Sequence, residues 1–561
     1  ARAFTNNDDV SLIIKTFPNP HNNVEELLTH FKQINPSFPD VIIIYDDLTE
    51  EELKALFLQV DVLIAPSRGE GFGLPIGEAM SIGLPVITTG WGGQMDFCNE
   101  DNCWLIDYKF GSSRSHLKSI DSYWAEPSVE DLVKQISNIY HSSPTELRKK
   151  TDYAIKDIQS FTWENNVKGN IKFIEKELIH NNSYKHFKLG CISPINSKCG
   201  IASYTKYLLL NTEEDVVFFT PFNENDELNH FSNINIVPSW NNGNKDDDLT
   251  FLKKKIISLE ITSLVIQFNY GFFDFSKLSI LINDLKEHGV KIFIILHSTL
   301  DPENDKSKSL NNLLESFKKA ERLLVHTIND LNRLKVTGLI NNVSLFPHGF
   351  LDFKPASKNI FTSINTIFQK KSFNIATYGF CLPNKGYKEL ILACSTLIEK
   401  GFNIRLTILS AIYSDEYYWV FEQLNDLIIE LDLKQSIFIN TSYMNDEQTL
   451  RILSTQDCLV FPYQETGESS SASVRHGIAS NKNVLVTPSP IFDDVSLLVN
   501  YLPGFSYLEI AQGLERWFSR FNDIKFKEEG LDSQREKILS ERIFSKLSYR
   551  LISMIKSLEL N

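Results

Sequence analysis

Short apolar runs alternate with helical patterns along nearly the whole chain, and this alternation most constrains the fold. The runs cover 10–15, 41–45, 62–66, 85–89, 103–107, 188–193, 216–221, 263–268, 291–296, 322–327, 342–347, 374–379, 405–410, 436–440, 458–462 and 483–488. Continuous apolar strands separated by helix-length segments indicate parallel sheets with helices on both faces. Such sheets bind ligands beyond the carboxyl ends of their strands, so we expect function in the loops that follow these runs.

Composition narrows the class of protein. A chain of 561 residues exceeds the size of one core, so three or four domains are expected. Seven scattered cysteines without a C-x-x-C pair favour reduced thiols in the cytoplasm. The first residues lack the features of a signal peptide, and no apolar run is long enough to predict a membrane-spanning helix. A net charge of −15 argues against nucleic acid as a partner.

An internal repeat sets the scale of the architecture. Asp61–Pro66 matches Asp457–Pro462, and Glu70–Thr89 aligns without gaps onto Glu468–Thr487, at offsets of 396 and 398 residues. Such a period exceeds one domain and fits a unit of two domains. At this offset Ala1 falls opposite a point inside the second copy, so the sequence predicts that the chain begins within a domain. Either the chain is a fragment of a longer tandem protein, or its first copy has decayed.

The most specific motif is PSRGEGFGLPIGEAMSIGLPVITTGWGGQMDF at 66–97, in which Glu70 and Glu78 accompany F-G-L-P, E-A-M, G-x-P-V-I and G-G. It resembles the carboxyl-terminal domain of retaining GT-B glycosyltransferases, notably glycosyltransferase family 4. The resemblance implies that Glu70 accepts hydrogen bonds from sugar hydroxyls and that Glu78 holds the ribose. The glycines and the following helix start would present backbone N–H groups to a diphosphate. This loop supplies the donor-binding candidates Gly71, Phe72, Gly73 and Leu74.

The second copy offers candidates after its strands. The loop 193–203 opens a helix at Gly200, and the resemblance implies that this turn approaches the donor phosphate and the acceptor. His297 ends a strand, as does the family's histidine that faces the transferred sugar. Phe346–Gly349 resembles the family's exit from the amino-terminal domain, where His348 is expected to be structural.

The segment Gly379–Gly386 resembles the strand, loop and helix that open the family's second Rossmann domain. There Lys385 would neutralise the departing nucleoside diphosphate, and Asn384 beside it would contact the donor. Many relatives also place an arginine in this loop, whereas this chain has none. The phosphate clamp is therefore only partly explained by the sequence.

The signature departs from the family pattern in the second copy. Glu468 occupies the place of the first glutamate, but His476, preceded by Arg475, occupies the place of the second. Either His476 bonds the ribose, or Arg475 contacts phosphate, or donor binding has changed. The glycine-rich loop is replaced by three serines whose hydroxyl and amide groups could hold phosphate: Ser469, Ser470 and Ser471.

These interpretations predict an α/β protein of the GT-B type. Twin doubly wound parallel-sheet (Rossmann-like) domains would be preceded by a partial carboxyl-terminal GT-B domain. The expected donor-binding part of the first copy is 1–180. The second copy would comprise an acceptor-side domain at 186–355 and a donor-binding domain at 370–561, with a boundary between Phe350 and Phe373. A terminal helix at 541–560 is expected to cross back onto the amino-terminal domain of that copy.

The expected function is a hexosyltransferase of polysaccharide or glycoconjugate biosynthesis. Its donor would be a nucleotide-diphosphate sugar, its acceptor a saccharide or a glycolipid, and the resemblance implies retention. No metal cofactor is expected, because no D-x-D ends a strand and lysine and helix dipoles supply positive charge. A cytoplasmic protein is expected, peripheral at the inner face of the membrane if the acceptor is held there. A nucleotide-sugar epimerase and a non-catalytic tandem scaffold remain the alternatives, and no motif encodes the sugar, base or acceptor.

Overall fold

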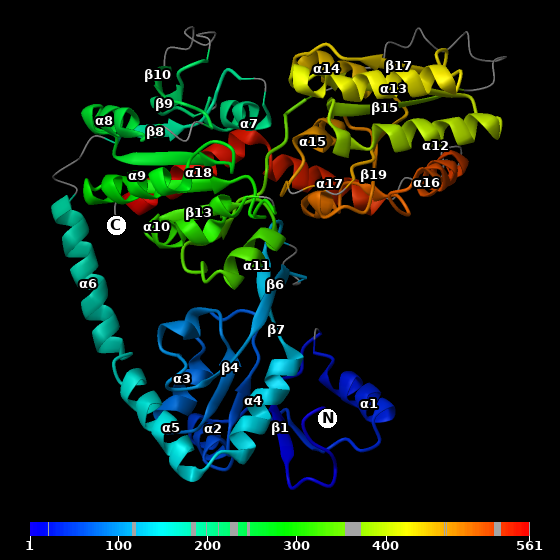
Figure 1. Cartoon of the computed structure of the whole chain (residues 1–561). Helices are drawn as coiled ribbons and strands as arrows, with labels where there is room; N and C mark the ends of the chain where they lie inside the picture. The colour runs from blue at the N-terminus through cyan, green and yellow to red at the C-terminus, as the bar shows by residue number, and fades with distance from the viewer. Residues whose placement is uncertain are drawn as a thin grey trace. The chain divides into compact units, whose positions relative to one another are not determined.

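The computed structural model describes residues 1–20, 22–114, 119–180, 187–197, 199–210, 212–224, 234–243, 247–303, 305–353, 372–464, 466, 468–520 and 529–559. The chain folds into two compact units, Ala1–Asn182 (unit 1) and Ser183–Asn561 (unit 2) (Figure 1).

The first sheet of unit 2 has seven parallel strands in the order β10-β9-β8-β11-β12-β13-β14. The order reverses between β8 and β11, so this is a doubly wound sheet with a switch point there. Its strands are β8 (Leu189–Ile192), β9 (Val216–Pro221), β10 (Ile234–Trp240), β11 (Ser263–Phe268), β12 (Lys291–Leu296), β13 (Arg322–Val325) and β14 (Val343–Leu345). Its helices are α7 (Gly200–Leu209), α8 (Thr250–Ser258), α9 (Phe275–Glu287), α10 (Leu314–Lys318) and α11 (Ile328–Val336).

The second sheet of unit 2 has six parallel strands in the order β17-β16-β15-β18-β19-β20, with its switch point between β15 and β18. Its strands are β15 (Phe373–Phe380), β16 (Ile404–Ala411), β17 (Ile437–Asn440), β18 (Cys458–Phe461), β19 (Asn483–Val486) and β20 (Asn500–Tyr501). Its helices are α12 (Tyr387–Glu399), α13 (Tyr418–Glu430), α14 (Asp446–Ser454), α15 (Ala472–Ala479), α16 (Tyr507–Arg520) and α17 (Glu529–Glu541).

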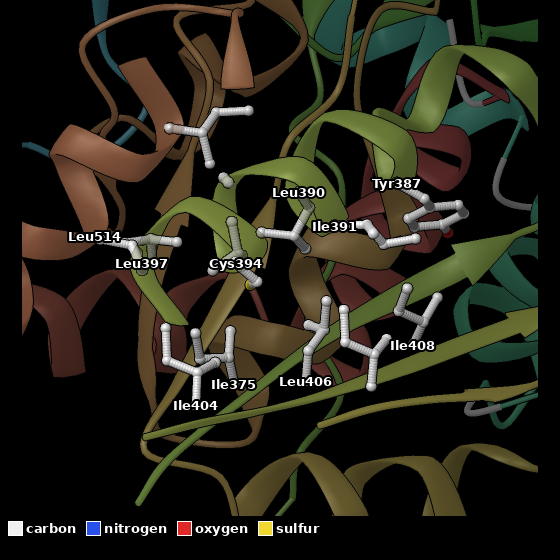
Figure 2. Packing of buried hydrophobic residues seen from close by; sticks show 14 of the residues in the cluster. Ile375, Tyr387, Leu390, Ile391, Cys394, Leu397, Ile404, Leu406, Ile408 and Leu514 are labelled. Carbon is white, nitrogen blue, oxygen red and sulfur yellow. The ribbon is translucent and has the colours of Figure 1, made fainter. Parts of the chain in front are cut away.

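Helix α12 covers one face of this second sheet. Its residues Leu390, Cys394 and Leu397 recur at helical spacing and are fully buried with Leu406 of β16 and Leu514 of α16 (Figure 2). Burying apolar side chains of this size stabilises the fold by roughly 1.5–3 kcal/mol each. This packing fixes the start of α12, and with it the loop that joins β15 to α12.

The last helix, α18 (Phe544–Glu559), returns to the first sheet. Phe544, Leu547 and Leu551 pack in one cluster with Leu189 of β8 and Tyr204 of α7. We call the first sheet of unit 2 with its helices the first lobe, and the second sheet with its helices the second lobe. In Figure 1 α18, coloured red, lies among the green elements of the first lobe. The chain segment before it pairs with Phe350, whose N–H donates to Arg542 O at 2.9 Å. Within the predicted domain boundary, residues 354–371 lie outside the described residues.

Unit 1 contains shorter sheets. Parallel strands β1 (Ser11–Lys15) and β2 (Asp40–Ile44) form one pair, and β3 (Leu63–Ala65), β4 (Val86–Thr89) and β5 (Trp104–Ile106) form another parallel sheet. An antiparallel ribbon follows, made of β6 (Tyr108–Ser112) and β7 (Tyr123–Pro127). The helices are α1 (Val24–Ile34), α2 (Glu50–Phe57), α3 (Leu74–Ser81), α4 (Val129–His141), α5 (Pro144–Ile158) and α6 (Trp163–His180).

The two sequence segments that match each other have similar local structure. Strands β3 and β4 flank α3 as β18 and β19 flank α15, and Leu63 pairs with Val86 as Leu459 pairs with Val484. In unit 2, β15 lies between β16 and β18. In the described part of unit 1, no strand pairs with both β1 and β3, so β1-β2 and β3-β4-β5 are separate sheets.

The predicted fold class is confirmed, and each predicted apolar run contains a strand in its sheet. The sequence missed β10, the two-residue β20 and the ribbon β6–β7. The ribbon escaped detection because neither of its strands, YKFGS and YWAEP, is a continuous apolar run. In the described residues, no helix is long and apolar enough to cross a membrane.

Candidate active site

The candidate site of unit 2 lies beyond the carboxyl ends of β15 and β18, the strands that flank the switch point of the second sheet. Lys385 ends the loop after β15, and Glu468 lies in the loop after β18. The two loops are joined by the Gln464 N–H, which donates to Asn384 O at 2.9 Å. Gly386 has φ of 70°, and a Cβ there would lie 1.8 Å from Pro462 O. The close approach of the two loops therefore requires glycine at this position.

The Lys385 side chain is only 8% exposed, yet its ammonium has anionic and aromatic neighbours. Its Nζ lies 3.7 Å from Glu468 Oε2 and 4.0 Å from the centre of the Tyr463 ring. Burial lowers the pKa of Lys385, but interactions with Tyr463 and Glu468 outweigh it and raise the pKa above its ordinary value. The site therefore keeps a positive charge where a leaving phosphate would need one.

Glu468 is the accessible member of this pair, because its side chain is 58% exposed. The next residue, Ser469, is buried and donates from Oγ to Asp330 Oδ1 at 2.7 Å. Asp330 belongs to α11 of the first lobe, so this bond joins the loop to the opposite lobe. Ser470 is half-buried. Ser471 is the N-cap of α15, with its Oγ accepting from Val474 N at 3.3 Å and donating to the Tyr463 hydroxyl.

Arg475 is buried and engaged within the protein. Its guanidinium forms an ion pair with Asp494 and donates to Ser471 O at 2.5 Å. The Phe350 ring, at the exit from the first lobe, lies 5.7 Å from Arg475 Cζ. These partners give Arg475 a structural position where the two lobes meet. A phosphate contact would require it to leave Asp494.

His476, the next residue of α15, contacts Asp446 of α14. Its Nε2 lies 2.7 Å from Asp446 Oδ1, and its Nδ1 lies 3.2 Å from Ala472 O. The ring packs against Tyr378, with centroids 4.8 Å apart. Asp446 was not singled out in the sequence, because the contact joins residues 30 positions apart.

The loop after β8 forms another part of the candidate site. Gly200 begins α7, and a Cβ there would lie 3.9 Å from Ala472 Cβ, so this helix start faces the start of α15. The carboxylate of Glu224 accepts hydrogen bonds from three successive backbone N–H groups of the loop, those of Ile195, Asn196 and Ser197. The loop thus forms a small anion-binding nest that the protein itself fills.

His297 follows β12 and has both ring nitrogens engaged. Its Nε2 lies 2.7 Å from the side-chain amide of Gln267, and its Nδ1 lies 3.3 Å from His326 Nε2. Burial, followed by the charge of His326, lowers the pKa of His297 well below its ordinary value. Burial likewise lowers the pKa of His326, although the hydrogen bond to the Phe346 carbonyl raises it in part. Both rings are therefore neutral.

Neutral rings allow one consistent placement of protons. His326 Nδ1 lies 2.9 Å from Phe346 O and must donate, so His326 Nε2 accepts from His297. His297 Nε2 is then an acceptor, and Gln267 must present its amide nitrogen to the ring. If the Gln267 amide is turned so that its oxygen faces the ring, its nitrogen is buried without a hydrogen-bond partner. A sugar hydroxyl could reach His297 Nε2 only by displacing Gln267.

A cleft of about 450 Å³ separates the facing ends of the two sheets. From the first lobe it is lined by Leu300, Thr327, Asn329 and Arg333, and from the second by Thr466, Glu468, Ser469, Pro488, Ser489, Pro490, Ile491 and Phe505. Arg333 Nη1 is held by Asp330 Oδ1 at 3.1 Å and by Thr299 Oγ1 at 3.3 Å. The sequence analysis missed Arg333 because it lies inside a helix with no motif around it.

In unit 1 the predicted residues lie around the start of α3. Glu70 Oε1 accepts from Ser67 Oγ at 2.6 Å, and Glu78 is exposed on α3. A Cβ on Gly93 would lie 1.8 Å from Gly71 O, so the two glycine-containing loops meet by backbone contact. Phe72 and Leu74 are exposed, and Gly73 is the N-cap of the helix. In the described part of unit 1, no second lobe faces these residues.

Unit 2 has two doubly wound lobes whose strand ends surround one cleft, and this arrangement defines the GT-B fold. Solved structures of similar fold match the chain. A glycosyltransferase from Rickettsia africae is 14% identical, covers 67% of this chain and 99% of its own, and has a TM-score of 0.54. Anabaena Alr3699/HepE in complex with UDP is 12% identical, covers 66% and 100%, and has a TM-score of 0.54. Sucrose-phosphate synthase from Thermosynechococcus elongatus is 12% identical, covers 66% and 99%, and has a TM-score of 0.53.

Sequence comparisons add the class of protein. Residues 5–111 match the family described as "Glycosyl transferases group 1". The MMP alpha-(1->4)-mannosyltransferase of Mycolicibacterium hassiacum is 25% identical over 171 residues, which are 30% of this chain and 36% of that protein. The chain thus spans about a third of that relative's length. Together these matches support a role in glycosyl transfer.

Proposed function

We propose that unit 2 transfers a hexosyl group, with retention, from a nucleotide-diphosphate sugar to a saccharide or glycoconjugate acceptor. The observation that carries this proposal is the buried Lys385 ammonium 3.7 Å from the accessible Glu468 carboxylate, at the switch point of the sheet. HepE, which shares the fold, has been solved with UDP and with UDP-glucose, and this supports a nucleotide-sugar donor.

Each member of the pair has a separate task in the proposed reaction. Lys385 neutralises the diphosphate as the bond from the sugar carbon to the phosphate oxygen breaks. Two charges about 4 Å apart interact by about 4 kcal/mol at an effective dielectric of 20, so this contact is substantial. Glu468 accepts hydrogen bonds from the sugar hydroxyls in the cleft, whose volume falls within the range of small-molecule sites. The acceptor oxygen attacks from the face that the phosphate leaves, and the phosphate takes its proton.

Helix α15 adds positive charge without a metal ion in this proposal. Its amino-terminal N–H groups lie at the end of the Glu468–Ser471 loop and favour an anion there. The described residues contain no cluster of three or more His, Cys, Asp or Glu side chains placed for a metal. Metal independence stays a prediction, and transfer should proceed at an unchanged rate in EDTA.

The test uses the full chain, a panel of nucleotide sugars, and donor consumption measured with and without saccharide acceptors. Transfer predicts donor loss that depends on the acceptor, together with a glycosylated product. An epimerase would instead change the sugar without acceptor, and a scaffold would bind donor without turnover. Lys385→Ala should lower transfer about 10²–10³-fold, whereas Lys388→Ala, an exposed lysine on the helix that follows, should leave it unchanged. Transfer at an undiminished rate in Lys385→Ala would overturn the assignment of the site.

A further inference from the structure

The position that carries Glu78 in unit 1 carries His476 in unit 2, and the histidine is already bonded on both sides. Its Nε2 faces Asp446 Oδ1 at 2.7 Å and its Nδ1 faces Ala472 O at 3.2 Å. Both ring nitrogens therefore face groups of the protein, the Asp446 carboxylate and the carbonyl one turn back in the same helix. His476 presents neither nitrogen to a ribose hydroxyl in this arrangement, so it does not replace a glutamate as an acceptor.

Asp446 supplies the accepting group instead. It opens α14 after the N-cap Asn445, and its Oδ1 takes the bond from His476. Its side chain is 28% exposed, against 13% for His476, so solvent reaches the carboxylate beyond the ring. An ionised carboxylate has about four acceptor positions, and Oδ2 has no hydrogen bond to any described residue. A vicinal diol can donate to such a group.

The pair stands beside a recess at the carboxyl ends of β15 and β16. The recess is lined by Ser442, Tyr443 and Met444, which lie on the segment that leads to the N-cap of α14, and by Ser473 and Tyr378. Tyr378 is the residue that packs on the His476 ring. Gly379, at the start of the loop that carries Lys385, also lines the recess. A nucleoside diphosphate with its phosphates near Lys385 could therefore place its ribose at this pair.

We infer that Asp446, oriented by His476, binds the ribose hydroxyls of the nucleotide donor in unit 2. This inference rests on the proposed function and names a ribonucleoside diphosphate as the ligand. The carboxylate that unit 1 carries on α3 as Glu78 is thus supplied in unit 2 by the neighbouring helix α14. His476 acts as a positioning residue, because it holds the carboxylate and does not itself accept from the ribose.

Calorimetric titration of the full chain tests this assignment. UDP, GDP and ADP are titrated first, and the one that binds tightest is compared with its 2′-deoxy form. Loss of binding in Lys385→Ala assigns the measured site to unit 2. Asp446→Asn keeps the shape but removes the charge, and should weaken the ribonucleotide about tenfold or more. It should also bring the preference for ribose over 2′-deoxyribose close to one.

Two further variants separate ribose binding from a structural role. His476→Glu should weaken binding because it places two carboxylates together, whereas Asp446→Asn combined with His476→Glu restores one carboxylate and should recover the ribose preference. Asp426→Asn, on the exposed face of α13, is the matched control and should leave binding unchanged.

Equal loss of ribo- and deoxyribonucleotide affinity in Asp446→Asn would overturn the inference and leave the pair as a structural contact. Unchanged affinity would overturn it as well. A wild-type chain that binds none of the three nucleotides would instead contradict the proposed function, and the ribose assignment would fall with it.

Discussion

Unit 1 has the more complete motif, and unit 2 has the more complete site. Around α3, Glu70 and Glu78 follow the family pattern, but in the described residues of unit 1 no second lobe faces them. Around α15, His476 breaks the pattern, yet Ser469 is bonded to Asp330 of the opposite lobe. A complete sequence motif and a site enclosed by two lobes therefore need not occur in the same unit of the chain. We therefore place the proposed catalysis in unit 2.

The largest expected difference between the units lies in their last helices. Each of these helices begins with an aromatic residue, but Phe544 is 6% exposed and Trp163 is 85% exposed. Phe544→Ala removes a buried ring and should lower the free energy of unfolding of unit 2 by about 3–5 kcal/mol. Trp163→Ala should change the stability of unit 1 by less than about 0.5 kcal/mol. Calorimetric unfolding measures both, and similar losses would break the comparison.

The next largest effect concerns the buried charge of Lys385 beside Glu468. Lys385→Ala should lower turnover about 10²–10³-fold, because removing a preorganised charge at the leaving group costs roughly 2.7–4 kcal/mol. Initial rates of transfer by the full chain, with Lys388→Ala as control, measure this effect. Undiminished activity in Lys385→Ala would argue for catalysis in unit 1 and reverse the assignment.

Paired glutamate variants test the two signatures directly. Glu468→Gln keeps the shape but removes a charge-assisted hydrogen bond, which costs about 1.5–3 kcal/mol, so turnover should fall at least about tenfold. Binding of the bare nucleoside diphosphate should change little. Glu70→Gln, the same change in unit 1, should leave turnover unchanged. If Glu70→Gln lowers turnover and Glu468→Gln does not, transfer depends on the complete motif of unit 1 and not on the enclosed site of unit 2.

The smallest predicted effect is a pH dependence of stability that is larger in unit 2 than in unit 1. Burial lowers the pKa of His297 and His348 well below the ordinary value of 6.5. Below pH 6.5 these two rings therefore bind more protons in the unfolded chain than in the folded protein. Their contribution to the free energy of unfolding is complete above pH 6.5, and it is lost as the pH falls toward the pKa that the rings have in the folded protein. Each group contributes up to about 1.4 kcal/mol per pH unit.

Calorimetry between pH 7.5 and 5.5 measures this dependence. The calorimetric transition of unit 2 should move to lower temperature as the pH falls, while that of unit 1 should move less, because His30 and His141 are exposed. His297→Gln should reduce the shift in unit 2. A pH-independent transition of unit 2 would show that these rings are protonated in the folded state as readily as in the unfolded chain.

Local sequence patterns predicted the sheets because each buried strand is a continuous apolar run. Strand β12, KIFIIL, is fully apolar after its first residue, and the loop after it could be located directly. The ribbon β6–β7 has no such run. Its pairing, for example Phe110 with Ala125, depends on aromatic contacts that join distant segments.

Only those residues of the candidate site that lie in recognisable motifs could be predicted from the sequence. Lys385 and Glu468 were found because each follows an apolar run, and the structure brings them together. Asp330 and Asp446 were missed because they lie at helix starts, where an acidic residue is expected for helix stability alone. Gln267 offered a signal, because a polar side chain inside the run SLVIQF must find a buried partner.

The pairing of Phe350 with the segment before α18 has a mechanical consequence. The chain leaves the first lobe at Phe350 and returns to it at Phe544, and the two crossings are hydrogen-bonded to each other, with Phe544 N–H donating to Phe350 O at 3.2 Å. Because the two crossings are bonded to each other, a change in the spacing of the lobes of unit 2 must either bend both crossings together or break this pairing. Separation of the lobes must also break the bond between Ser469 and Asp330, which joins them.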